Sequence, residues 1–285
     1  MEIKKFPKEY WPEGLREIPQ PPKELFILGD FPEEDLIFLA VVGSRKFTTY
    51  GKDVCEKLIM GLSGQPVAII SGFALGIDTI AHETAMKAKL RTIVFPGSGL
   101  GRRAIFPQAN VALVPKILEH GGCLISEFPE EMKAAQWTFP MRNRLMAGIA
   151  RAILVIEAEE KSGTLITARL ATEYNRDVLA VPGSIYSPNS KGTNRLIRQG
   201  ATPITSVEDL LDALDLKKDD EEIQQKLFAD LSKEEMNVID TLREPMARDE
   251  LIRTLGMSTQ EANTLLTVME IKKLIKEELG EIRRT

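Results

Sequence analysis

Residues 37–51 read IFLAVVGSRKFTTYG, and this stretch decides the fold class. Its first six residues are apolar without a polar interruption, which is typical of a strand buried on both faces. The strand ends at Gly43, and residues 51–62 then carry apolar side chains three and four positions apart, as an amphipathic helix does. A buried strand followed by a helix is the unit of a parallel α/β sheet.

The same unit recurs along the chain. Further strand-like runs lie at 66–72, 91–97, 122–127, 151–158, 177–183 and, more weakly, 202–206. Helical periodicity separates them at 78–89, 110–121 and 163–175. The sequence therefore predicts that 37–215 is a doubly wound α/β domain with about seven strands. Ligands of such sheets bind outside the carboxyl ends of the strands.

The flanking segments differ from this domain. Residues 1–36 contain six prolines, and we expect an extended lead-in that lies over a core formed elsewhere. Residues 216–228 are charged and predict a linker. Residues 229–285 predict a small winged-helix-like domain, with helices at 232–244, 247–256 and 258–273 and a hairpin at 274–285. Ser232 and Glu235 have the spacing of a capping box.

Composition excludes several classes of protein. The 285 residues carry a net charge of −5, which excludes a bulk-basic nucleic-acid binder but not a local basic groove. Two distant cysteines and two histidines exclude a disulfide framework and a cysteine-rich zinc site. The first residues lack the apolar core of a signal peptide, and no apolar run is long enough to span a membrane. We expect a cytoplasmic protein without a metal site.

The turns after the strands carry the chemistry. Gly43, Ser44 and Arg45 follow the first strand, where a hydroxyl and a guanidinium suit a phosphate. Ser71 and Gly72 end the second strand and lead into a helix whose free amides favour an anion. Asp78 is the natural N-cap of that helix, and the weak Asp78–His82 pair is interpreted as structural. A solvated turn at Arg45 is the structural alternative.

Two later segments add cations and an aromatic ring. Arg142, Asn143 and Arg144 follow Phe139, which is the candidate stacking face for a base. The alternative is that Phe139 belongs to the core and the arginines pair with acids. After the fifth strand, a second anion-binding turn is predicted at a helix start, formed by Lys161, Ser162, Gly163 and Thr164. These turns suit several phosphates rather than one reacting atom.

Two nucleotide-binding patterns are absent. The segment PGSGLGRR (96–103) has arginine where a dinucleotide fingerprint needs its last glycine, and there is no P-loop. No cofactor is therefore predicted. The competing interpretation is an enzyme, a phosphoribohydrolase-like nucleotide hydrolase on a related sheet. The PGGxGTxxE pattern that is usual for such hydrolases is absent. Glu157, an acid at the end of a predicted strand, is the residue to test for a catalytic role. A third interpretation, an interaction module acting through the winged helix, leaves the polar sheet edge unexplained.

The segments GSRKFTTYG, SGFALGIDTIAH, FPMRNR, KSGTLITA and VPGS…KGTN…LIRQGA resemble the DprA/Smf family of DNA-processing proteins, from about residue 10 to about 214. The resemblance implies an extended Rossmann-like fold that binds single-stranded DNA without cutting it. It also implies loading of RecA onto that DNA in natural transformation and recombination, and action as a homodimer. No catalytic residue is implied.

Residue by residue, the resemblance assigns phosphate contacts to the turns described above and to the FPxRNR segment. It leaves Asp78 and His82 as structural residues. The sequence begins at the family's lead-in, so we expect it to lack the helical SAM-like domain that precedes this point in many members. From residue 221 on there are 10 basic and 14 acidic residues, which favours a protein-contact role for the winged helix over DNA binding.

Overall fold

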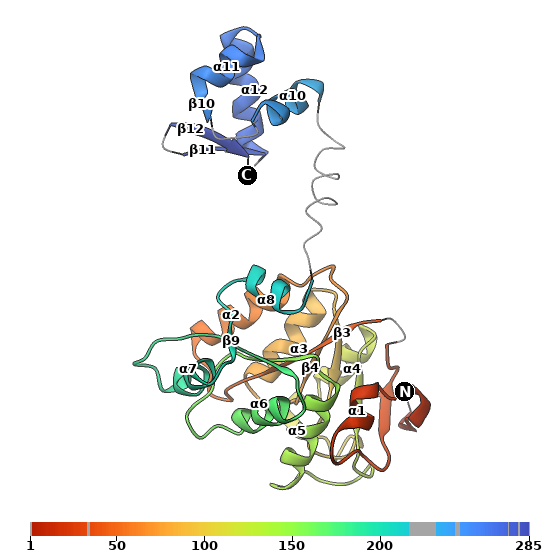
Figure 1. The fold of residues 1–285 in the computed structure, drawn as a ribbon. Coiled ribbons are helices and arrows are strands. Elements are labelled where there is room, and N and C mark those ends of the chain that lie inside the picture. Colours follow the sequence, from red (N-terminus) through yellow and green to blue (C-terminus); the bar gives the residue numbers. More distant parts are fainter. Residues whose placement is uncertain are drawn as a thin grey trace. The chain divides into compact units, whose positions relative to one another are not determined.

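The computed structural model describes residues 2–32, 35–216, 232–242, 246–272, 274–278 and 280–284. The chain divides into two compact units, Met1–Leu216 and Lys217–Thr285, which are both drawn in Figure 1. The predicted linker covers residues 216–228, and all of it beyond residue 216 lies outside the described residues. In the described part of the chain, no helix has the length and apolar character needed to cross a membrane.

The larger unit is built on a sheet with nine described strands. Seven of them are parallel, and each lies within one of the seven strand-like runs, so the predicted doubly wound fold is confirmed. Across the sheet these strands are β6 (Cys123–Ser126), β5 (Arg91–Val94), β4 (Val67–Ser71), β3 (Ile37–Val42), β7 (Ala152–Val155), β8 (Asp177–Ala180) and β9 (Thr202–Pro203).

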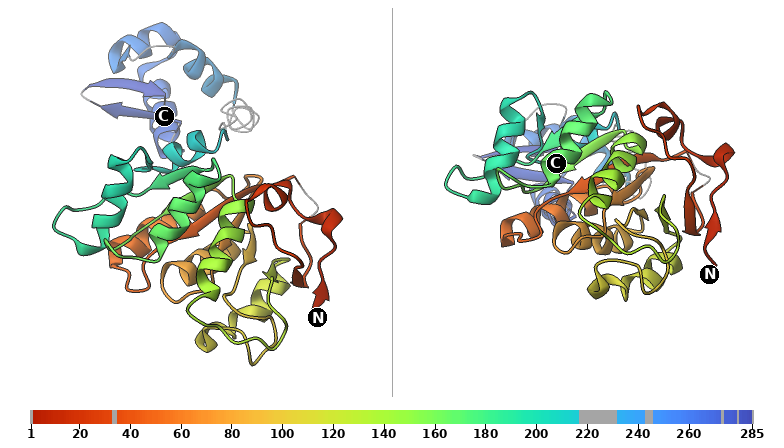
Figure 2. Two further views of the ribbon diagram at one scale, coloured as in Figure 1. Left: turned by 60° about the horizontal axis from the view of Figure 1, so that its bottom comes forward. Right: turned by 90° about the horizontal axis from the view of Figure 1, so that it is seen from below.

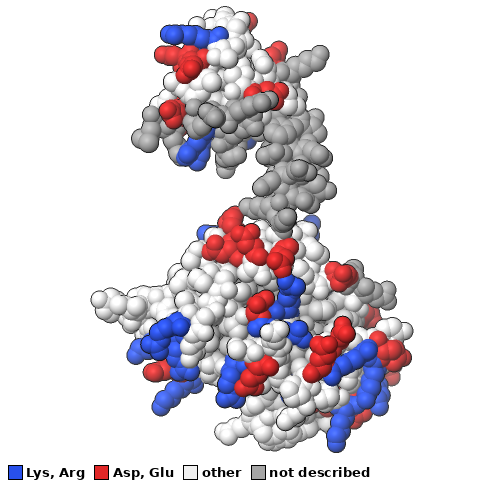
Figure 3. Space-filling view, viewed as in Figure 1, with Lys and Arg blue, Asp and Glu red and all other residues white. Residues whose placement is uncertain are grey.

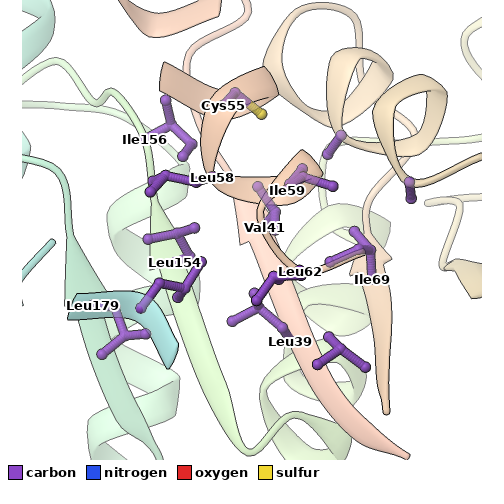
Figure 4. Close-up of a cluster of buried hydrophobic side chains, with 14 of the residues drawn as sticks. Leu39, Val41, Cys55, Leu58, Ile59, Leu62, Ile69, Leu154, Ile156 and Leu179 are labelled. Atoms are coloured by element: carbon purple, nitrogen blue, oxygen red, sulfur yellow. The ribbon is translucent and has the colours of Figure 1, made fainter. Parts of the chain in front are cut away.

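The central strand β3 shows why this sheet needs helices on both faces. Leu39 and Val41 enter one core, and Ala40 and Val42 enter the other, because successive side chains of a strand point to opposite faces. All four are at most 5% exposed. Figure 4 shows Leu39 and Val41 among the side chains of the first core.

Each face is covered by its own set of helices, as Figure 2 shows from two further directions. The first core is closed by α2 (Thr49–Met60), α3 (Ile77–Lys87) and α8 (Val207–Ala213). The second is closed by α1 (Glu13–Glu17), α5 (Thr138–Ile149) and α6 (Thr164–Glu173). Beyond them lie α4 (Leu113–Glu119), α7 (Lys191–Arg198) and the short 3₁₀ turns Lys8–Tyr10, Gln108–Asn110 and Pro188–Ser190.

The lead-in differs from the prediction. It adds β2 (Phe26–Gly29) antiparallel to β6 and β1 (Lys4–Lys5) antiparallel to β2. Trp11 and Leu15 are buried in the second core, and the Trp11 indole donates to the Phe6 carbonyl at 2.9 Å. The expectation of a segment lying over a core formed elsewhere was wrong, because the apolar residues between the prolines complete this core.

The smaller unit has the predicted order of elements and its own core. Its described elements are α10 (Lys233–Thr241), β10 (Met246–Ala247), α11 (Arg248–Leu255), α12 (Thr259–Ile271), β11 (Ile275–Glu278) and β12 (Glu281–Arg284). The short strand β10 was not predicted. The three strands form a sheet in the order β10, β12, β11. The capping box predicted for Ser232 and Glu235 is confirmed, with the Glu235 amide donating to the Ser232 hydroxyl at 3.2 Å.

Candidate nucleic-acid interface

A groove of about 480 Å³ opens at the carboxyl ends of β3 and β7, between α5 and α6. We call it the first groove. Four segments line it: the loop after β3, the start of α3, the first turns of α5 and the loop leading into α6. Its lining is Val42, Gly43, Ser44, Arg45, Lys46, Ala74, Asp78, Gln136, Phe139, Pro140, Arg142, Asn143, Met146, Glu159, Ser162, Gly163, Thr164, Ile166 and Thr167.

Most of the residues singled out in the sequence meet in this groove. They are Gly43, Ser44, Arg45, Phe139, Arg142, Asn143, Ser162, Gly163 and Thr164. Of the other four, Gly72 lines a small adjoining pocket with Arg45 and Phe139. Ser71 and Arg144 are buried behind the groove, and Lys161 lines a neighbouring groove.

The loop after β3 is held in shape by its own backbone contacts and by α6. Gly43 has no room for a side chain, because an added Cβ would lie 2.7 Å from Ile77. Its carbonyl accepts a hydrogen bond from the Thr164 hydroxyl at 3.2 Å. The Ser44 hydroxyl accepts from the Lys46 amide at 3.0 Å. The loop is therefore preorganised, which lowers the entropy cost of binding a ligand.

Arg45 is a cation that this loop leaves available. Its side chain is exposed, and it has no acidic partner among the described residues. Its guanidinium carbon lies 5.7 Å from the centre of the Phe139 ring, within the range of a cation–π contact. Phe139 in turn lies 6.0 Å from Phe106, centre to centre. A planar cation thus lies over an aromatic ring at the mouth of the groove.

Arg142 has a different environment, since it is 6% exposed. Its guanidinium donates to the carbonyls of Gly72 and Phe95, which directly follow β4 and β5, and to the Asn143 amide oxygen at 2.9 Å. Burial lowers the pKa of Arg142 to about 10, and the nearby Asp78 carboxylate opposes that shift. Gly72 is required here, because an added Cβ would lie 2.1 Å from the Arg142 guanidinium.

Arg144 faces away from the groove. It pairs with Glu127, and the side chains are 6% and 11% exposed. Burial raises the pKa of Glu127, while Arg144 acts to lower it. The pairing of an arginine with an acid is the structural alternative that the sequence left open for this segment, and the structure shows it for Arg144.

The start of α3 corrects one prediction. Asp78 is the second residue of the helix, and the N-cap is Gly76, at φ +91°. The Asp78 carboxylate accepts from the Ala74 amide at 3.2 Å and so closes the loop rather than capping the helix. Burial raises the pKa of Asp78, against the lowering effect of Arg142. Ser71 is fully buried and donates to the Val41 carbonyl at 2.6 Å.

His82 stands behind this loop, fully buried in α3. Its Nδ1 lies 2.6 Å from the Thr92 hydroxyl, and its Nε2 has no hydrogen-bond partner among the residues that the structure describes. Burial, and secondly the charge of Arg142, lower the pKa of His82 to about 3. The ring therefore stays neutral at ordinary pH and supports the loop from inside.

Glu157, the acid that the enzyme interpretation would use, is 2% exposed and does not line the groove. Its carboxylate accepts hydrogen bonds from the Thr48 amide at 2.9 Å and the Thr48 hydroxyl at 2.6 Å. It ties the end of β7 to the start of α2. Within the described residues, no cluster of three or more histidines, cysteines or acids could hold a metal ion.

Several groove residues were not predicted from the sequence. Lys46 directly follows Arg45, so its position was readable from the motif. Gln136 and Glu159 lie in loops, and Ile166 and Thr167 lie on the groove side of α6. Only the approach of α5 to α6 brings these residues to one place, and no local pattern carries that information.

Comparison with known proteins identifies the family. Residues 3–215 match the model for DNA recombination-mediator protein A. The chain belongs to this family. Residues 220–280 match the DprA winged helix domain, and the predicted resemblance to the DprA/Smf family is confirmed.

Several relatives of this family resemble the chain over its larger unit. It is 40% identical to the DNA processing protein DprA of Bacillus subtilis over 211 residues, which is 73% of this chain and 69% of that one. It is 39% identical to protein Smf of Escherichia coli over 206 residues, and there the chain spans about half of the relative, 54% of its length.

Solved structures agree with the fold. The crystal structure of DprA from Streptococcus pneumoniae matches with a TM-score of 0.69 and 38% identity over 74% of each chain. DNA processing protein A from Helicobacter pylori, studied for its single-stranded DNA binding mode, matches with a TM-score of 0.67 and 28% identity over 75% of this chain and 95% of that one.

Proposed function

We propose that this chain binds single-stranded DNA in the first groove and hands it to the RecA recombinase, without cutting it. The observation that carries the proposal is Arg45, which is exposed and has no acidic partner among the described residues, beside Phe139 at the carboxyl edge of the sheet. Membership of the recombination-mediator family supports it, as does the single-stranded DNA binding mode of the Helicobacter pylori relative.

The residues of the groove divide the work. Ser44, Arg45 and the amides at the start of α6 hold backbone phosphates, because a guanidinium and free amides suit an anion. Phe139 offers its ring to a base. Arg142 and Asn143 act from below by fixing the loops after β4 and β5, since the Arg142 guanidinium is occupied by the Gly72 and Phe95 carbonyls.

A single strand suits this arrangement better than a duplex. Base stacking on an aromatic side chain needs an unpaired base with an accessible face. Phe139 lies beside the cation that would hold the phosphate, so one nucleotide reaches both. Phosphate contacts and stacking carry little sequence information, and we expect a weak preference among sequences.

The groove is tested by binding of labelled oligo-dT and of a duplex of equal length over a salt series. We expect tighter binding of the single strand. Arg45→Ala should weaken it about tenfold or more, as expected for the loss of a charged contact. The salt slope of log K should fall by about 0.7 for the lost phosphate. Lys57→Ala, in the last turn of α2 leading away from the groove, is the matched control.

Two results would contradict this site. One is equal affinity for duplex and single strand. The other is an Arg45→Ala variant that binds as wild type does. Turnover of a nucleoside monophosphate that is lost in Glu157→Gln would instead support the hydrolase, which no observation in the groove favours.

We further propose that the DNA-bound chain, acting as a homodimer, recruits RecA in natural transformation and recombination, as the family resemblance implies. At limiting RecA, the growth of the RecA filament on single-stranded DNA is monitored through the rate at which RecA hydrolyses ATP. We expect the chain to shorten the lag before hydrolysis, and Arg45→Ala to lose this effect at protein concentrations where wild type is active. If the wild-type chain does not shorten the lag before ATP hydrolysis, the loading role is overturned.

A further inference from the structure

A second groove, of about 810 Å³, lies between α6 and α7 and reaches the start of β9. It adjoins the first groove, because Ser162, Gly163 and Ile166 line both. Gly163 is exposed, and an added Cβ there would meet nothing within 4 Å, so the ridge between the grooves is open. A DNA strand that left the first groove across this ridge would enter the second groove.

The cations of the second groove fall into two kinds. Arg169 pairs with Glu173, and Arg176 donates to the Gly148 carbonyl at 3.1 Å, so both already have protein partners. Lys161 and Arg195 are exposed, and neither side chain has a hydrogen bond or ion pair within the described residues. Two acids, Glu160 and Asp177, also line the groove, against four basic residues.

The sequence around α7 adds to this charge. Residues 178–207 contain Lys191, Arg195 and Arg198 and no acidic residue, in a chain whose net charge is −5. All three cations are exposed, and the described residues give none of them an ion-pair partner. Figure 3 shows basic side chains gathered where Figure 1 places α7. Unpaired like charges that face solvent repel one another, and this cost is relieved by a polyanion.

We propose that the second groove binds the phosphates of the same DNA strand beyond the nucleotides held in the first, through Lys161 and Arg195. This inference rests on the proposed function and extends the strand's path from the ends of β3 and β7 to α7. The two cations come from different segments of the groove, Lys161 from the loop before α6 and Arg195 from α7, so a DNA backbone that runs through the groove can contact both.

The test compares two lengths of oligo-dT, about 4 and about 16 nucleotides, which bracket the site sizes of single-strand-binding folds. The double variant Lys161→Ala/Arg195→Ala should bind the short oligonucleotide as wild type does. Its affinity for the long one should fall about tenfold, with a salt slope smaller by about 1.4 for two lost phosphates. Lys87→Ala, an exposed cation at the end of α3 and outside both grooves, is the control.

The outcomes separate this inference from the function on which it rests. Unchanged binding of the long oligonucleotide by the double variant overturns the second groove, while Arg45→Ala still reports on the first. An equal loss for both lengths also overturns it, because the cations then act on the nucleotides of the first groove. If Arg45→Ala leaves both lengths unaffected, the proposed function fails and this inference with it.

Discussion

At the scale of single residues, burial separates two arginines that look alike in the sequence. Arg45 is exposed and without an acidic partner among the described residues, whereas Arg142 is 6% exposed and bonded to two carbonyls. A buried guanidinium needs its hydrogen bonds satisfied, so Arg142 becomes part of the scaffold. Arg142 also sets the charge environment of Asp78 and His82 behind the loop.

The buried imidazole gives the fold a pH dependence. Because the pKa of His82 is about 3 in the folded chain and near 6.5 in the unfolded one, only the unfolded chain gains a proton between these values. The contribution of the neutral His82 ring to the free energy of unfolding is therefore fully present above about pH 6.5. It is lost as the pH falls, by up to about 1.4 kcal/mol per pH unit.

The measurement is the free energy of unfolding by urea between about pH 4 and pH 6, for wild type and His82→Asn. The variant keeps a polar group that reaches toward Thr92 but does not titrate. We expect its stability to change less steeply with pH. Equal slopes for the two proteins would show that His82 takes up its proton in the folded state.

At the scale of elements, α5 decides how the FPMRNR segment is used. The periodicity did not predict this helix, since Pro140 is a helix breaker in most positions. Proline is tolerated in the first turn, and Pro140 is the third residue of α5. Residues two apart on a helix point to opposite sides. Arg142 therefore lines the groove, and Arg144 faces Glu127 behind it.

At the scale of the whole molecule, negative charge is concentrated in the smaller unit, with 14 acidic against 10 basic residues from 221 on. Its cations are partly used internally. Arg248 bonds Glu270 and Glu277 at 3.3 and 2.6 Å, and Lys272 bonds Glu235 at 2.6 Å. These pairings neutralise Arg248 and Lys272, which favours a protein-contact role for the winged helix over phosphate binding by these two cations.

A chain ending at residue 216 tests this division of roles. We expect it to bind oligo-dT as tightly as the full chain, because the first and second grooves both lie within Met1–Leu216. Equilibrium binding of the two chains at equal salt is the measurement. A marked loss of affinity in the shorter chain would place DNA contacts in the winged helix.

The sequence by itself determined the parallel sheet, the position of the polar turns at its carboxyl edge and the winged-helix order, because periodicity and turn residues are local properties. Only the tertiary structure decided which turn residues reach solvent. Ser71 and Arg142 are covered by neighbouring strands and loops, whereas Arg45 stays open beside Phe139. The tertiary structure also brought Lys161 and Arg195 to one groove, since they lie on segments that meet only when α6 and α7 both pack against β8. Burial and long-range packing depend on distant parts of the chain.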